Sequence, residues 1–148
     1  MAQLFRLPEA ASLGVHAAVL LAGRHNGFVS AADLAQELVA SEAHLAKVMQ
    51  RLVRAGIVQS TRGPKGGFTL ARPADEVTLL EVYEAVEGEV EPARCVFGEP
   101  VCGRKSCLFG GMTEELDARY HNYMANARLS GLAEEKETAD VSAADHPD

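Results

Sequence analysis

Residues 57–70, with the sequence IVQSTRGPKGGFTL, constrain the fold of this chain more than any other stretch. β-Branched and aromatic residues flank a turn rich in Gly and Pro, a pattern that predicts a β-hairpin. The turn lacks the GxxxxGK[ST] spacing and the following helix of a phosphate-binding loop. Arg62 and Lys65 stand at its tip, so the hairpin is placed to reach the phosphate backbone of a nucleic acid.

Helices are predicted on both sides of the hairpin. Pro8 suits the first turn of a helix that ends near residues 23–27. Ser30 and Ser41 are typical N-cap residues for a short helix to about residue 39 and a second one to about residue 55. Two helices separated by a few residues, the second of them basic, form the helix-turn-helix pattern. After the hairpin, Thr78 and Glu81 match the capping box of a further helix.

The charge of the chain is unevenly distributed. The formal net charge is −7, but residues 43–72 hold six cations and no acid. The acidic side is concentrated in residues 134–148, which carry −5 and few bulky apolar side chains, so we expect a disordered tail. A solvated helix face is the simpler interpretation of the basic run, but such faces usually mix signs. The run is therefore interpreted as a DNA-binding face.

Three cysteines, Cys95, Cys102 and Cys107, lie within thirteen residues in the stretch CVFGEPVCGRKSC and are all the cysteine that the chain has. An odd number cannot pair fully as disulfides within one chain. Thiolates are soft ligands for iron–sulfur clusters, zinc or copper(I). The spacing C-x6-C-x4-C differs from the C-x2-C pairs of zinc fingers. An iron–sulfur cluster is favoured, ahead of a zinc site or a bare thiol switch, and incidental cysteines are the last alternative.

A long helix over residues 111–129 is predicted to follow the cysteines, because apolar residues recur along it at helical spacing. Little of a small domain is left to cover such a stripe, which makes pairing with a second subunit plausible. The longest uncharged apolar run has about 14 residues, too short for the roughly 20 that span a bilayer. We therefore expect a cytoplasmic protein without membrane association, in a compartment where thiols stay reduced.

This order of elements, with LAKVMQRLVRAGIV leading into RGPKGGFTLARPADEVTLLEVYEAVEG, resembles the IscR- and NsrR-type regulators, the Rrf-two family of bacterial winged-helix repressors. The resemblance covers about residues 5–132. It implies a homodimer held by the C-terminal helix and bound to a near-palindromic operator in double-stranded DNA. It also implies a [2Fe-2S] or [4Fe-4S] cluster on the three loop cysteines that senses iron, nitric oxide or redox state.

The chain departs from the family pattern in its ligands. A cluster usually needs four protein ligands, and only three cysteines exist here. IscR-like members place a His three residues after the last cysteine, where this chain has Gly110. NsrR-like and RsrR-like members take a ligand from the first helix, and His16 aligns with such a histidine. His16 is thus the candidate for the fourth metal ligand, although a lone His on an apolar helix is more often a packed residue. Glu9 in the same helix fits better as a first-turn acid.

The sequence thus predicts a mainly α fold with a β-hairpin wing: a winged helix-turn-helix domain over residues 1–88, a cysteine sensor loop over 89–109, a dimerisation helix over 110–132 and an acidic tail over 133–148. The function predicted is a transcriptional regulator, a repressor as the resemblance implies, whose operator binding is modulated by the cluster. The alternatives are a cluster-free regulator, or a protein-interaction module, that uses the cysteines as a zinc site or thiol switch. No nucleophile with an attendant base indicates an enzyme. The predicted DNA contacts are Ser41, Ala43, His44, Lys47, Arg51, Arg62 and Lys65.

Overall fold

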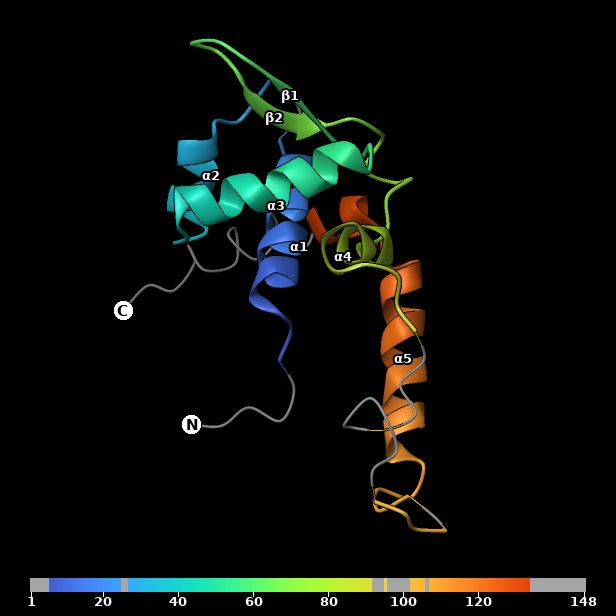
Figure 1. Cartoon of the computed structure of the whole chain (residues 1–148). Coiled ribbons are helices and arrows are strands. Elements are labelled where there is room, and N and C mark those ends of the chain that lie inside the picture. Colours follow the sequence, from blue (N-terminus) through green and yellow to red (C-terminus); the bar gives the residue numbers. More distant parts are fainter. Residues whose placement is uncertain (1–5, 25–26, 92–94, 96–101, 106, 134–148) are drawn as a thin grey trace, which may run out of the picture.

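The computed structural model describes residues 6–24, 27–91, 95, 102–105 and 107–133. Within them the chain is mostly helical with one two-stranded antiparallel hairpin, which confirms the predicted fold class (Figure 1). The elements are α1 (Glu9–Ala22), α2 (Ala31–Glu37), α3 (Glu42–Arg54), β1 (Val58–Thr61), β2 (Gly67–Leu70), α4 (Leu79–Glu87) and α5 (Met112–Asn126). No helix among the described residues is long and apolar enough to cross a membrane.

Side-chain caps begin three of the helices where the sequence predicts them. The Ser30 hydroxyl accepts the amide hydrogen of Asp33 at 3.0 Å and starts α2. The Ser41 hydroxyl accepts the amide hydrogen of His44 at 3.4 Å and starts α3. Thr78 and Glu81 form a complete capping box at the start of α4. Each cap satisfies amide groups that the first helical turn leaves without partners.

Helix α1 runs through the centre of the domain and packs against both α3 and α4. Gly14 makes this close approach possible, because a Cβ atom there would lie 2.8 Å from Val86 and 3.3 Å from Val48. The fully buried side chains around this contact come from the helices, the hairpin and the segments that join them. They include Leu34, Leu45, Met49, Leu52, Val58, Val77, Val82 and Leu129.

The hairpin is attached to the body by its second strand. β1 and β2 pair antiparallel with Val58 opposite Leu70 and Thr61 opposite Gly67. Phe68 on β2 also exchanges two backbone hydrogen bonds with Val29, at 2.8 and 2.9 Å, and its ring is buried in the core. The wing therefore has a fixed position relative to α2 and α3, while its turn extends away from the body (Figure 1).

We expect a Gly67→Ala substitution to loosen the wing. Gly67 has φ +149°, and a Cβ atom there would lie 2.2 Å from the Val29 carbonyl oxygen, so the bridge between Val29 and Phe68 has to open. The expected loss is about 1–3 kcal/mol in the free energy of unfolding. Denaturant unfolding measures it. The control is Gly131→Ala, which meets open space and is expected to leave stability unchanged or slightly raised; equal stabilities for the two variants would contradict the account.

Helix α5 ends earlier than the sequence predicts. We expected helix to about residue 129, but α5 ends at Asn126 and Ala127 is extended. The next residues pair with the segment before α4: the Leu79 amide donates to the Ala127 carbonyl and the Leu129 amide donates to the Val77 carbonyl, both at 3.0 Å. Helix resumes over residues 129–133. Burial of Leu129 in the core and this tertiary pairing override the local helical pattern.

Candidate nucleic-acid interface and cysteine segment

One face of α3 is exposed next to the wing. Ala43 and Lys47, both predicted to lie near base edges, are exposed on it. Gln50 and Arg54 are also exposed and continue this face at helical spacing, although we did not predict them as contacts. The spacing i, i+4, i+7 and i+11 from Ala43 is the signal that could have identified them. A helix of this kind fits the major groove of DNA, which is about 12 Å wide.

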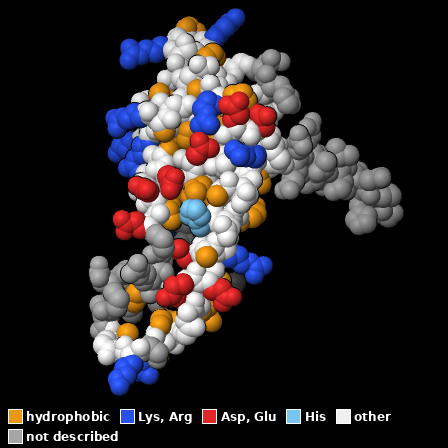
Figure 2. All heavy atoms as spheres, turned by 90° about the vertical axis from the view of Figure 1, so that its right-hand side faces the viewer, with side chains coloured by type: hydrophobic (Ala, Val, Ile, Leu, Met, Phe, Trp, Pro, Cys, Tyr) orange, Lys and Arg blue, Asp and Glu red, His pale blue; other side chains and the backbone are white. Residues whose placement is uncertain are grey.

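The turn of the wing carries its charges into solvent. Arg62 and Lys65 are both exposed, and Gly63 and Pro64 lie between them in the turn. Gly63 has φ +110°, and its carbonyl accepts the amide hydrogen of Gly66 at 2.9 Å. In Figure 2 several Lys and Arg side chains lie at the end of the molecule that carries the hairpin and along the edge below it, while others lie lower on this face and at the opposite end. Exposed cations of this kind are the side chains that pair with phosphate groups of a nucleic acid backbone.

Three residues of the predicted basic face have partners within the protein. Arg51 donates to the Val86 carbonyl of α4 at 2.6 Å. His44 is half-buried, with its Nδ1 atom 3.6 Å from the carboxylate of Glu9 on α1. Arg72 binds Glu81. Ser41 caps α3, so its hydroxyl is also in use. Arg51 is exposed like Lys47, Arg54, Arg62 and Lys65, but of these five cations only Arg51 has a hydrogen-bond partner among the described residues.

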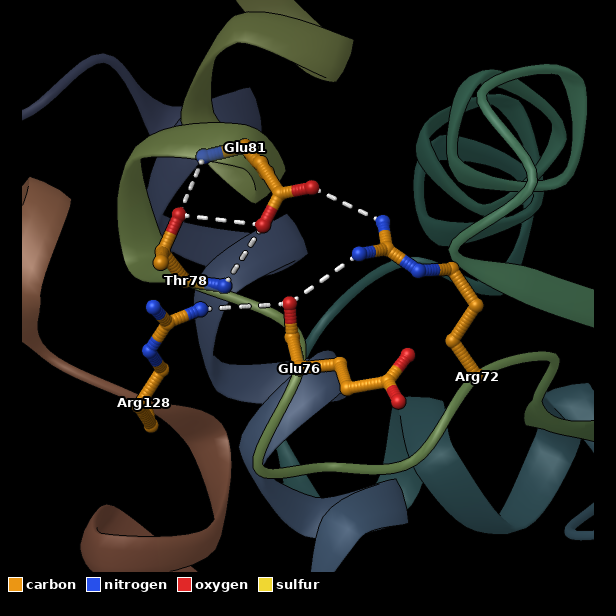
Figure 3. Close-up of polar contacts among 5 residues, drawn as sticks. All are labelled: Arg72, Glu76, Thr78, Glu81 and Arg128. Atoms are coloured by element: carbon orange, nitrogen blue, oxygen red, sulfur yellow. Dashed lines mark hydrogen bonds and ion pairs between the residues drawn. The ribbon is translucent and has the colours of Figure 1, made fainter.

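A polar network joins the exit of the wing to the start of α4 and the end of α5 (Figure 3). Arg72 donates to the Glu81 carboxylate at 2.8 Å and to the Glu76 carbonyl at 3.0 Å. Arg128, just after α5, donates to the same Glu76 carbonyl at 3.3 Å. The other carboxylate oxygen of Glu81 accepts hydrogen bonds from the backbone and the hydroxyl of Thr78. The network thus connects the segment after β2 with the segment after the C-terminal end of α5, through the loop that carries Glu76.

We expect this network to weaken in acid. Partial burial of the Glu81 carboxyl favours its neutral form, but hydrogen bonds from Arg72 and Thr78 outweigh burial and lower its pKa. A lowered pKa in the folded state means that the stabilisation is present above the unfolded pKa of about 4.3 and is lost as pH falls through the folded pKa. Glu81→Gln should therefore cost about 0.5–1 kcal/mol of unfolding free energy at neutral pH, a small value because the pair is partly exposed and screened, and progressively less as the pH falls toward 3.

Unfolding free energies of wild type and Glu81→Gln, measured by urea titration between pH 3 and 7, test this dependence. Glu76→Gln is the matched control, since Glu76 joins the network by its backbone carbonyl. A Glu81→Gln penalty that stays constant over this pH range would contradict the assigned pKa direction.

The segment that carries Cys102 and Cys107 lies at the end of α5 that points away from the domain. Residues 102–105 and 107–111 lie beyond the N-terminal end of α5 (Figure 1). Cys102 is exposed, whereas Cys95 and Cys107 are half-buried, and all three are free thiols. The amide of Phe109 donates to the Cys107 sulfur at 3.4 Å. Residues 92–94, 96–101 and 106 of the predicted loop, and 134–148 of the predicted tail, lie outside the described residues.

The structure does not bring His16 to the cysteines within one chain. His16 is exposed on α1, next to the body of the domain, whereas the cysteine segment lies at the opposite end of α5 (Figure 1). Its Nδ1 atom lies 2.7 Å from the Ser12 carbonyl oxygen, and a carbonyl only accepts, so Nδ1 carries the proton. In the neutral ring this leaves Nε2 with a lone pair. Among the described residues of a single chain, no three His, Cys, Asp or Glu side chains converge to hold a metal ion.

Helix α5 is poorly covered by its own chain. Of its fifteen residues only Met124 is buried. Large apolar side chains along it and just before it are more than two-fifths exposed, namely Leu108, Phe109, Met112, Leu116 and Tyr123. Figure 2 shows apolar side chains among the acidic ones down this side of the molecule. An isolated helix of this length is marginal in water, so a partner surface would stabilise it.

The helix-turn-helix, the basic outward face of α3 and the paired strands after it define a winged-helix DNA-binding protein. Comparison with known proteins is more specific. The sequence signature of the Rrf2 family, described as an iron-dependent transcriptional regulator, matches residues 7–135. The chain belongs to this family, and is a transcriptional regulator, not an enzyme.

Individual relatives agree with this assignment. The chain is 33% identical over 121 residues to the HTH-type transcriptional regulator IscR of Escherichia coli K12, covering 81% of this chain and 74% of that protein. It is 32% identical over 116 residues to IscR of Photorhabdus laumondii, covering 78% and 71%. The fold resembles CymR, the global cysteine regulator of B. subtilis, with a TM-score of 0.74, 22% identity and coverage of 89% and 98%. It also resembles T. potens IscR, with a TM-score of 0.73, 22% identity and coverage of 92% and 91%.

Proposed function

We propose that this protein is a homodimeric regulator in the cytoplasm whose binding to an operator in double-stranded DNA is controlled by an iron–sulfur cluster on Cys95, Cys102 and Cys107. The observation that carries the proposal is the position of the cysteine segment. It lies in sequence between α4, which packs on the recognition helix, and α5, which is the exposed helix. A change in this segment therefore acts on both elements that set how two recognition helices are spaced.

The DNA contact is proposed to use α3 in the major groove and the wing on the backbone. Ala43, Lys47 and Gln50 are exposed on α3 in positions to meet base edges, and Gln pairs well with adenine. Arg62 and Lys65 on the wing reach phosphates, which fix position and supply affinity without reading sequence. Ser41 and His44 act mainly by holding the N-terminal end of α3 in place.

The dimer is proposed to form through α5. Burial of Met112, Leu116 and Tyr123 against a second copy would remove the largest exposed apolar stripe that the described chain presents. If the two α5 helices pair about a two-fold axis, the dimer presents two α3 helices, one for each half-site of an operator. A two-fold symmetric protein of this kind binds a near-palindromic operator. The acidic side chains between the apolar ones then lie at the rim of the interface.

The donor set fits an iron–sulfur cluster, because thiolates are the usual ligands of such clusters. When bound, the cluster would supply the sensitivity to iron, nitric oxide or redox state. The chain's own part is to present the three thiols: Cys102 from solvent, and Cys95 and Cys107 from half-buried positions. The Phe109 amide donates to the Cys107 sulfur, which holds this thiol next to the start of α5.

We propose His16 of the partner subunit as the fourth ligand. Within one chain α1 and the cysteine segment are far apart, so a second copy has to supply the residue (Figure 1). The hydrogen bond from Nδ1 to the Ser12 carbonyl fixes the ring and leaves Nε2 to bind metal, which is the usual second-shell arrangement for a histidine ligand. Glu9 is less suited to this role because it faces His44.

Lys65→Ala tests the wing contact. A lost phosphate contact lowers the slope of log Kd against log salt by about 0.9, and thus by about 1.8 for a dimer on its operator. The measurement is fluorescence anisotropy from 50 to 300 mM salt with an operator selected by the protein from a pool of randomised duplexes. Lys105→Ala removes an exposed lysine from the cysteine segment and is the matched control. An unchanged slope for Lys65→Ala would exclude the wing as a phosphate contact.

Anaerobic purification and reconstitution, followed by iron, sulfide and zinc analysis, separate the proposed cofactor from its alternatives. Iron and acid-labile sulfide in equal amounts support the cluster. Zinc alone, or a metal-free protein whose thiols oxidise reversibly, would replace the cluster by a zinc site or a thiol switch. Failure to bind any duplex in these states would favour a protein-interaction module instead of a DNA-binding regulator.

A further inference from the structure

The recognition helix is tied directly to the end of α4 by one side chain. Arg51 on α3 donates from its guanidinium to the Val86 carbonyl at 2.6 Å, across 35 residues of sequence. Val86 belongs to the last turn of α4, where helix carbonyls have no partner within the helix and the helix dipole is negative. Helix α4 has no basic residue in its own last turn. Arg51 therefore supplies from α3 the cation that α4 lacks.

The same end of α4 holds the beginning of the cysteine segment. The helix ends at Gly88, whose amide donates to the Glu84 carbonyl at 2.9 Å. The Val90 amide donates to the Glu84 carboxylate at 3.2 Å. The last turn of α4 thus holds the recognition helix through Val86 on one side and the chain that leads to Cys95 on the other.

The side chains around Val86 are closely packed. Val86 is buried, and a Cβ atom on Gly14 of α1 would lie 2.8 Å from its side chain and 3.3 Å from that of Val48 on α3. Close-packed interiors transmit small shifts instead of absorbing them. A displacement of the last turn of α4 has to move α3, because α1, α3 and α4 meet at this contact.

We propose that Arg51 is a positioning residue that couples the state of the cysteine segment to the orientation of the recognition helix, and that it is not a phosphate contact. This inference rests on the proposed function, because it assumes that the cysteine segment changes state. It differs from the expectation for a basic residue on a recognition helix, which is to contact the DNA backbone. All three cations on α3 are exposed, but the Arg51 guanidinium is held by the Val86 carbonyl of α4, whereas Lys47 and Arg54 have no hydrogen-bond partner among the described residues.

The test compares Arg51→Met with Arg54→Met, which removes the same charge from an exposed position on the same helix. Two quantities are measured on the selected operator duplex: the salt slope, and the ratio of Kd values for cluster-loaded and cluster-free protein. We expect Arg51→Met to bring this ratio to within about twofold of one, from the 5- to 150-fold typical of allosteric coupling, and to keep the wild-type salt slope. Arg54→Met should keep the wild-type ratio of Kd values and lower the salt slope. Arg51→Lys, which keeps a donor and the charge, should restore part of the ratio.

A second measurement does not depend on a cluster. Hydrogen exchange of the Gly88 and Val90 amides in cluster-free protein should be at least about fivefold faster in Arg51→Met than in Arg54→Met, because the last turn of α4 loses its anchor. A lowered salt slope with an unchanged Kd ratio for Arg51→Met would overturn the proposal and make Arg51 a phosphate contact. Equal exchange rates in the two variants would also overturn it. A protein that takes up no cluster would refute the proposed function alone, since the exchange measurement still decides the role of Arg51.

Discussion

A Leu116→Glu variant is expected to be monomeric and to bind a selected palindromic operator at least about 100-fold more weakly than the wild-type protein. Leu116 is 55% exposed near the middle of α5, so a charge there leaves the fold of the single chain intact. In the proposed dimer the same charge would be buried without a partner, which is strongly unfavourable. A monomer occupies one half-site at a time and loses the gain in affinity from linking two contacts.

Sedimentation equilibrium gives the association state and fluorescence anisotropy gives Kd for the operator. Ala118→Glu is the matched control, because residue 118 is exposed on α5 and lies on a different face from Leu116. It adds the same charge to the same helix and should remain dimeric with the wild-type Kd. A Leu116→Glu protein that stays dimeric, or a monomer that keeps the wild-type affinity, would refute α5 as the functional interface.

The second large effect is expected from the cysteines. The triple variant Cys95→Ser, Cys102→Ser and Cys107→Ser should bind no iron after anaerobic reconstitution and should lose the visible absorption of a cluster. Serine is close to cysteine in size, but its oxygen is a hard donor, so it does not replace a thiolate. Its operator Kd should equal that of cluster-free wild type in every redox condition, because the segment no longer changes state.

Met112→Leu is the control for this variant. It removes a sulfur atom at the start of α5 but no thiolate, and Leu and Met are close in volume. It should load with iron like the wild type. Iron retained by the triple variant would show that the cysteines are not the ligands. His16→Ala that loads fully and keeps an unchanged spectrum would exclude His16 as the fourth ligand.

Local signals made most of the fold predictable from the sequence. Ser30, Ser41 and Thr78 cap their helices as expected, because the groups that they satisfy lie within three residues along the chain. The hairpin was predictable for the same reason. The end of α5 was not, since Ala127 leaves the helix to pair with a segment that is 48 residues earlier. The helical periodicity of the sequence does not indicate this long-range pairing.

The candidate site was also predictable only where local sequence determines it. The basic run was visible in the sequence, but which of its charges face outward depends on long-range contacts. Arg51 and Arg72 belong to the run and yet bind Val86 and Glu81. Gln50 was not predicted as a contact, because the prediction relied on charge and the Gln side chain is a neutral amide. In the proposed dimer the fourth cluster ligand comes from the partner chain, so neither the sequence nor the structure of one chain could place it next to the cysteines.

The central claim is that the cysteine segment controls DNA binding. The most direct measurement is the operator Kd of one anaerobic preparation, taken before and after cluster loading, with iron and sulfide assayed on the same samples. The account predicts stoichiometric iron and sulfide after loading and a change in Kd of at least about fivefold, the lower end of typical allosteric coupling. Loaded protein with the same Kd as cluster-free protein, or protein that binds DNA but never takes up iron, would contradict it.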